Sequence, residues 1–232
     1  MRQDGRQDDE ALSRYQYFEI KGCLISKSYK VIIFDLGNTL IRFDHNISAK
    51  KLANLFHLDS EKVKSLFFDS GLTRLFEKGL ISNKGFHSRV AELLNIKISF
   101  GDFATIWNDI FWEDEESCRI ARELKHDYRL LLLSNINRMH FDYIVRKFDI
   151  MKIFDDMVLS FIVGAMKPEH PIFQEAVKKA GVEKSAILYI DDRDDLIKEA
   201  NALGIESIKY EGAQKLKKDL KERGIYGKGD QD

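Results

Sequence analysis

The sequence VIIFDLGNTL, residues 31–40, contains the feature that best indicates the fold of this chain. It begins with β-branched and aromatic residues, which are typical of a strand buried on both faces. The chain then reaches Asp35 and turns through Gly37 and Asn38. In open parallel α/β sheets, ligands bind at the carboxyl ends of the strands, where Asp35 is expected to lie. Taken alone, Asp35 is equally suited to capping the loop that follows.

The composition is ordinary for a globular protein. Its 232 residues are enough for one sizeable α/β domain with a substantial insertion, or for two small domains. With 37 basic and 38 acidic residues, the chain has no electrostatic preference for nucleic acid or an anionic membrane, and neither is an expected partner. No apolar run approaches the roughly 20 residues that span a bilayer.

Two features favour a cytoplasmic location. Cys23 and Cys118 are far apart and lack metal-ligand spacing, so no disulfide framework is expected, which fits a reducing compartment. Residues 1–10 are polar and lack the apolar segment of a signal peptide.

The chain is predicted to divide into three parts. Residues 1–29 form a peripheral extension that is expected to be partly disordered, although residues 15–25 fit either an extra strand or a short docked segment. Residues 30–45 and 126–226 form the α/β core, and residues 46–125 form a helical subdomain inserted into it.

The inserted subdomain has a helical pattern throughout. A short linker, residues 41–46, leads into it, and no part of the span predicts a β-strand. Serines that can cap helix N-termini mark four of the expected starts, and a last helix is expected at residues 118–125. These serines are Ser48, Ser60, Ser82 and Ser99. The aromatic residues within these helices are expected to form the subdomain's core.

From residue 128 the pattern changes to alternating strands and helices, which is typical of a Rossmann-like parallel sheet. Strands are predicted at residues 128–133, 156–160, 186–190 and 205–210. Helices are predicted at residues 168–179, 196–203 and 212–223.

Reactive side chains follow several of these strands. Ser134 ends one strand, Asp191 and Asp192 end another, and Lys167 stands at the mouth of a helix. Right-handed crossovers would bring all of them to the same edge of the sheet as Asp35. Taken singly, Ser134 could be a cap, Lys167 a surface lysine and the Asp191–Asp192 pair a turn. Their occurrence together favours a functional site.

This mixture of groups suits phosphoryl transfer. A carboxylate such as Asp35 can attack phosphorus and form an aspartyl-phosphate. Its approach to a phosphate dianion requires positive charge, which Mg²⁺ held by carboxylate and carbonyl oxygens supplies. A lysine and a serine hydroxyl can hold the phosphoryl oxygens in the transition state.

The same residues resemble the motifs of the haloacid dehalogenase-like hydrolase superfamily. In order, the four motifs are FDLGNTL at residues 34–40, LLLSN at 131–135, MKPEHPIF at 166–173 and YIDDRDDLIKEANALGI at 189–205. The resemblance covers about residues 30–210 and implies a parallel sheet core with an inserted type-one helical cap.

The resemblance also implies a role for individual residues. Asp35 would be the nucleophile, and Ser134 and Lys167 would bind phosphate and assist catalysis. Asp192 would be the main Mg²⁺ ligand, helped by Asp191, Asp35 and the carbonyl of Gly37. The candidates for contacts with the rest of the substrate are Asn135, Asn137, Arg138 and Arg42, with Lys78 as a weaker one.

One position departs from the usual DxDxT pattern. Gly37 stands where a second aspartate normally acts as general acid and base, a role worth roughly 10²–10⁴-fold in rate. A branch similar to α-D-glucose-1-phosphate phosphatases also reads DLGN here, and it resembles this chain at residues 134–138, 167–173 and 77–82. Asp44 and His45, just after the first motif, are the expected substitutes.

The sequence therefore predicts a Mg²⁺-dependent phosphomonoesterase that acts on a small phosphorylated metabolite such as a sugar phosphate. One alternative is attack on carbon, as in 2-haloacid dehalogenases, which carry an aromatic residue at the position of Gly37 and use no metal. Without a metal, however, Asp191 and Asp192 would repel each other and Asp35. The other alternative is a binding protein that has lost its general acid. The oligomeric state is not predicted.

Overall fold

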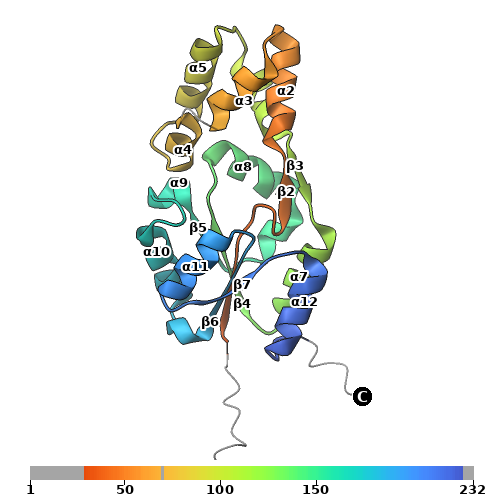
Figure 1. Cartoon of the computed structure of the whole chain (residues 1–232), viewed down its shortest axis with the longest axis vertical. Coiled ribbons are helices and arrows are strands. Elements are labelled where there is room, and N and C mark those ends of the chain that lie inside the picture. Colours follow the sequence, from red (N-terminus) through yellow and green to blue (C-terminus); the bar gives the residue numbers. More distant parts are fainter. Residues whose placement is uncertain (1–28, 69–70, 227–232) are drawn as a thin grey trace, which may run out of the picture.

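The computed structural model describes residues 29–68 and 71–226. Residues 1–28, most of the predicted N-terminal extension, therefore lie outside the described part. The core is a five-stranded parallel sheet in the order β5-β4-β1-β6-β7, which confirms the predicted Rossmann-like α/β class (Figure 1). The strands are β1 (Val31–Phe34), β4 (Arg129–Ser134), β5 (Asp156–Leu159), β6 (Ile187–Asp191) and β7 (Glu206–Lys209).

Helices cover both faces of this sheet. Ile32 and Phe34 of β1 pack into one apolar cluster, with side chains of α7 (Glu115–Leu124), α8 (Arg138–Lys147) and α12 (Ala213–Glu222). Val31 and Ile33 pack into a second cluster on the other face, with α10 (His170–Ala180) and α11 (Asp194–Ala202). Because successive strand residues point to opposite faces, this division explains why all of β1 is apolar.

A separate group of helices, which we call the helical cap, stands over the carboxyl edge of the sheet (Figure 1). It consists of α2 (His45–Phe56), α3 (Ser60–Phe68), α4 (Leu72–Glu77), α5 (Asn83–Leu94) and α6 (Phe100–Asn108). Its own core contains the fully buried rings of Phe86, Phe103 and Trp107, which confirms the expectation that the aromatic residues are core. Ser82 and Ser99 cap α5 and α6 as predicted.

Several local predictions need correction. The predictions of a linker at residues 41–46 and of an insertion without strands were wrong. Strand β2 (Ile41–Phe43) pairs antiparallel with β3 (Phe111–Glu113). Helix α2 begins at His45 with Asp44 as its cap, so Ser48 lies inside the helix. Ser60 is the first residue of α3 rather than a residue before it. Helices α4, α8 and α9 (Ser160–Val163) were not predicted.

Short connecting elements complete the described chain. They are the 3₁₀ helices η1 (Asp149–Ile153) and η2 (Lys184–Ala186). The predicted domain boundaries remain predictions, but α7, expected within the insertion, packs against α12 and the sheet. Among the described residues, no helix is long and apolar enough to cross a bilayer.

Candidate active site

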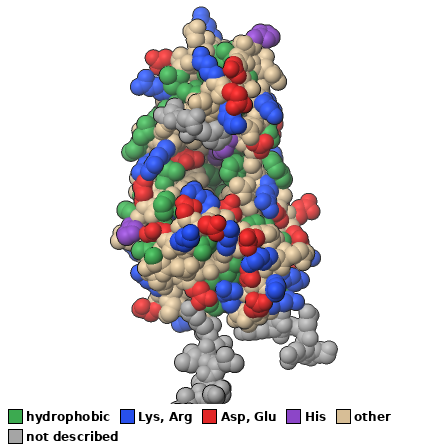
Figure 2. Space-filling model, viewed as in Figure 1, with side chains coloured by type: hydrophobic (Ala, Val, Ile, Leu, Met, Phe, Trp, Pro, Cys, Tyr) green, Lys and Arg blue, Asp and Glu red, His purple; other side chains and the backbone are tan. Residues whose placement is uncertain are grey.

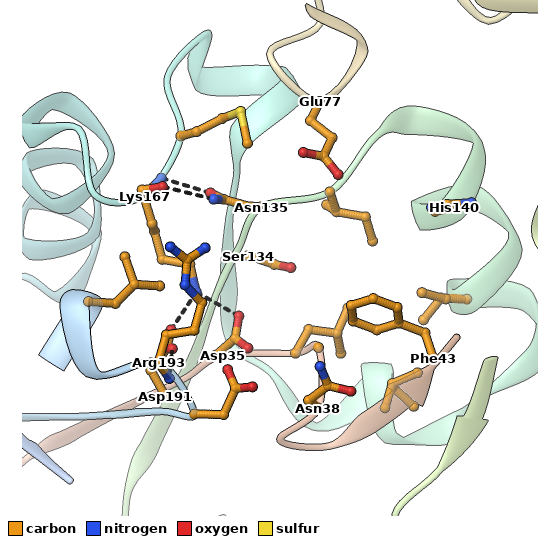
Figure 3. A pocket seen from close by; sticks show the side chains of 18 of the residues that line it. Asp35, Asn38, Phe43, Glu77, Ser134, Asn135, His140, Lys167, Asp191 and Arg193 are labelled. Atoms are coloured by element: carbon orange, nitrogen blue, oxygen red, sulfur yellow. Dashed lines mark hydrogen bonds and ion pairs between the residues drawn. The ribbon is translucent and has the colours of Figure 1, made fainter. Parts of the chain in front are cut away.

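A cavity of about 240 Å³ lies between the carboxyl edge of the sheet and the helical cap. The space-filling view shows a hollow in the surface between the sheet and the helical cap (Figure 2). Asp35, Ser134, Lys167, Asp191 and Asp192 all line the cavity, so the reactive side chains that follow different strands do meet in one place (Figure 3).

Lys167 joins two carboxylates at the floor of this cavity. Its Nζ donates to Asp35 Oδ1 and to Asp191 Oδ2, at 2.6 Å in each case. The lysine side chain is only 2% exposed, and those of Asp35 and Asp191 are 9% and 0% exposed. Tyr189 also donates to Asp191, and so does the backbone N–H of Arg193. The buried ammonium is thus shared between both acids.

Burial and charge shift the pKa values of this cluster. Burial raises the pKa of Asp35 to about 7, because the attraction of Lys167 only partly offsets desolvation and Asp191 adds repulsion. Burial by itself lowers the pKa of Lys167, but the adjacent Asp35 and Asp191 outweigh it and the pKa ends above its usual value. Lys167 is therefore a fixed positive charge at neutral pH.

Asn135 fixes the segment that carries Lys167. The Asn135 side chain donates to the Lys167 carbonyl at 3.0 Å and accepts from the Lys167 N–H at 2.7 Å. Ser134, the last residue of β4, lines the cavity and is 2% exposed. Ser134 and Asn135 at the end of β4 thus have different surroundings. The Asn135 side chain binds the backbone of Lys167, whereas Ser134 faces the cavity.

Three carboxylates at this floor could hold a cation. Asp35, Asp191 and Asp192 each place an oxygen within 4.8 Å of the others. Burial and the charge of Asp191 raise the pKa of Asp192, so a cation here would relieve repulsion. Hard oxygen donors of this kind suit Mg²⁺.

The ring of Phe43, the last residue of β2, lies close to Gly37. A Cβ atom at Gly37 would lie 2.8 Å from a ring carbon of Phe43, so a carboxylate side chain here would require the ring to move. The ring of Phe43 therefore occupies space that an aspartate side chain at position 37 would need.

The substrate-contact candidates are not brought together. Asn137 is fully buried as the N-cap of α8, where its side chain bonds His140. Arg138 pairs with Asp142 and lines a different, shallow hollow. Arg42 pairs with Asp114 and Lys78 with Glu169. Of the predicted substrate contacts, only Ser134, Asn135 and Lys167 line the cavity.

The two expected acid/base substitutes differ in position. Asp44 accepts bonds from the backbone and the side chain of Asn46, and it does not line the cavity. His45 does line it, with its ring 5.1 Å from that of Phe43. Burial lowers the pKa of His45 to about 4, so its imidazole is neutral at pH 7.

Two further residues at the cavity escaped sequence reasoning. Tyr189 was seen only as part of an apolar strand, although its hydroxyl binds Asp191. Glu77 lines the cavity from the end of α4, and its only sequence signal is the segment of residues 77–82 noted above.

Comparison with known proteins places the chain among hydrolases. A family model described as haloacid dehalogenase-like hydrolase matches residues 29–204. D-ribitol-5-phosphate phosphatase of Bacteroides thetaiotaomicron is 23% identical over 198 residues, covering 82% of this chain and 96% of that protein.

Solved structures share the fold. The enzyme BT-2542 of B. thetaiotaomicron, in complex with magnesium and inorganic phosphate, matches with a TM-score of 0.72 and 24% identity, over 78% of this chain and 94% of that one. L-2-haloacid dehalogenase of Xanthobacter autotrophicus, with chloropropionic acid covalently bound, matches with a TM-score of 0.58 and 15% identity, over 86% and 85% of the two chains.

Proposed function

Because this chain belongs to the haloacid dehalogenase-like hydrolase family, we propose that it is a Mg²⁺-dependent phosphomonoesterase acting on a small phosphorylated metabolite, such as a sugar or sugar-alcohol phosphate. The observation that carries this proposal is the arrangement of Asp35, Lys167 and the Asp191–Asp192 pair on one cavity floor. The phosphatase name of the Bacteroides relative, which this chain matches over nearly its whole length, supports it.

In this proposal, Asp35 attacks the phosphorus atom of the ester. A new bond forms between Asp35 and phosphorus while the bond to the leaving oxygen breaks, and the leaving oxygen takes a proton from water, which gives an aspartyl-phosphate and an alcohol. Lys167 and Ser134 hold the phosphoryl oxygens as charge develops on them. Water then attacks the phosphorus of the phosphoryl-enzyme and releases phosphate, which restores Asp35.

The donor set on the cavity floor fits a divalent cation. Asp35, Asp191 and Asp192 would hold it, with the carbonyl oxygen of Gly37 as a further ligand. When bound, Mg²⁺ offsets the repulsion between the carboxylate nucleophile and the negatively charged phosphate.

We also propose a cytoplasmic location for the protein, where Cys118, a free and buried thiol, stays reduced.

We expect phosphate release from a panel of sugar phosphates, polyol phosphates, nucleotides and phosphoglycolate to require Mg²⁺. Treatment with EDTA should lower kcat by about 10²-fold or more, because the charge of three clustered carboxylates then opposes phosphate binding. Added Mg²⁺ should restore the rate. Halide release from 2-haloacids without metal, or no turnover of any ester with Mg²⁺ present, would overturn the proposed function.

We propose His45 as the group that accepts the proton of the attacking water, since it is the one expected substitute that lines the cavity. His45→Gln should slow phosphoenzyme hydrolysis by about 10²-fold, the lower end of general-base effects, because a pKa near 4 makes it a weak base. Rapid-quench detection of the phosphoenzyme measures this step. His126→Gln, at an exposed position, is the control. An unchanged rate of hydrolysis in His45→Gln would exclude this role.

A further inference from the structure

Glu77 places a carboxylate in the cavity at the end opposite Asp35 (Figure 3). It is the last residue of α4 and the only acidic residue that the helical cap contributes to the lining, within the described part of the chain. Within residues 29–68 and 71–226, its carboxylate has no hydrogen-bond donor or ion-pair partner. Burial raises the pKa of Glu77 to about 7, as expected for a carboxyl group withdrawn from water.

The backbone at Glu77 is tied to the sheet domain. The Ser160 hydroxyl donates to the Glu77 carbonyl at 2.6 Å and accepts from the N–H of Ile136 at 2.9 Å. Ser160 therefore joins the end of α4 to the loop after β4. Because this loop also follows Ser134, the position of Glu77 is coupled to the phosphate-binding end of the cavity.

Neighbouring residues fix the same corner of the cap. Gly79 has φ +69°, and a Cβ atom there would lie 2.2 Å from the carbonyl oxygen of Phe161, so only glycine allows this close approach. Lys78 and Arg74 both pair with Glu169, at 2.7 Å and 3.0 Å. The backbone and the neighbouring residues therefore fix the position of Glu77, and its carboxylate stays available at the cavity.

The rest of the cavity lining mixes apolar and polar side chains. Phe43, Phe111, Ile136 and Met166 are apolar, whereas Asn38, His45, His140 and Arg193 are polar. Among the described lining residues that the helical cap contributes, Glu77 is the only carboxylate, and it can accept hydrogen bonds from a ligand. A half-buried carboxylate that a ligand covers must find a hydrogen-bond donor or lose binding free energy, so it discriminates against ligands without a donor.

We propose that Glu77 selects the substrate by accepting hydrogen bonds from hydroxyl groups at the end remote from the phosphate. This inference rests on the proposed phosphatase function and specifies its substrate class as polyol or sugar monophosphates. When ionised, Glu77 also disfavours molecules with a second anionic group at that end, such as phosphorylated carboxylic acids, because like charges at short range repel.

The test compares three phosphorylated compounds in the full-length protein with Mg²⁺. Ribitol 5-phosphate carries remote hydroxyls, 3-phosphoglycerate carries a remote carboxylate, and acetyl phosphate, the smallest of the three, carries neither. We expect Glu77→Ala to lower kcat/KM for ribitol 5-phosphate by about 10–100-fold, mainly through KM, the range for a lost hydrogen bond to a charged group. The rate with acetyl phosphate should change less than about threefold.

Two further variants separate recognition from folding. Glu77→Gln keeps the shape and an acceptor oxygen, so it should recover part of the ribitol 5-phosphate activity and raise kcat/KM for 3-phosphoglycerate. Glu92→Gln changes an exposed glutamate of the cap and should leave all three rates unaltered. An equal loss with all three compounds, or no loss with any, would overturn the role of Glu77. A wild-type protein inactive even with acetyl phosphate would instead reject the phosphatase function itself.

Discussion

Asp35→Asn is expected to lower the rate of phosphate-ester hydrolysis by about 10⁴–10⁶-fold, the range seen when a covalent nucleophile is removed. An amide oxygen is a poor nucleophile toward phosphorus, and the other lining residues that follow β1, Leu36, Gly37 and Asn38, carry no carboxylate. The fold should persist, because an asparagine oxygen can still accept the bond from Lys167, and Lys167 keeps Asp191 as a partner. Thermal unfolding followed by circular dichroism checks this point.

The phosphoenzyme supplies a second readout for Asp35. Intact-protein mass spectrometry after mixing wild-type protein with acetyl phosphate and Mg²⁺ should detect one added phosphoryl group, which the Asp35→Asn variant should lack. Asp149→Asn, which alters an exposed carboxylate of η1, should behave as wild type in both assays. Turnover by Asp35→Asn within tenfold of wild type would contradict the assignment of the nucleophile.

The sheet and its polar edge could be predicted because their signals are local. Strands β1, β4 and β6 are short, mostly apolar runs, and Ser134 and Asp191 end two of them. The antiparallel pair β2 and β3 has no comparable signal, since each strand has three residues and its partner lies about seventy residues away. Three residues are too few to establish an alternating pattern against a helical background.

The directions of side chains at the site were harder to predict than their places in the chain. Asn137 follows the same strand as Ser134, but it begins α8, and an asparagine at an N-cap turns its side chain back to the helix backbone. Glu77 shows the opposite case. A helix as short as α4 carries little periodicity. The end of α4 is held by the bond from Ser160 to the Glu77 carbonyl and by the close approach of Gly79 to Phe161, both of which are far away in the sequence.

The shared ion pair of Lys167 has a consequence for stability as well as catalysis. Lys167→Met should destabilise the protein by about 3–5 kcal/mol in EDTA, because it leaves Asp35 and Asp191 buried without a compensating charge. The free energy of unfolding from urea titrations at neutral pH measures the loss. Lys152→Met, at an exposed ion pair, should cost less than about 1 kcal/mol.

The double variant Lys167→Met/Asp191→Asn tests whether the loss comes from the stranded charges rather than from packing. Removing the charge of Asp191 ends its repulsion with Asp35. The N–H of Arg193 can still donate to the amide oxygen in the place of Oδ1, and the Tyr189 hydroxyl can accept from the amide NH₂ in the place of Oδ2. We therefore expect the double variant to be more stable than Lys167→Met alone, with a coupling of about 0.5–3 kcal/mol between the two sites. Additive losses would mean that Lys167 stabilises the fold through its aliphatic chain, and that the two acids are tolerated in the cavity without it.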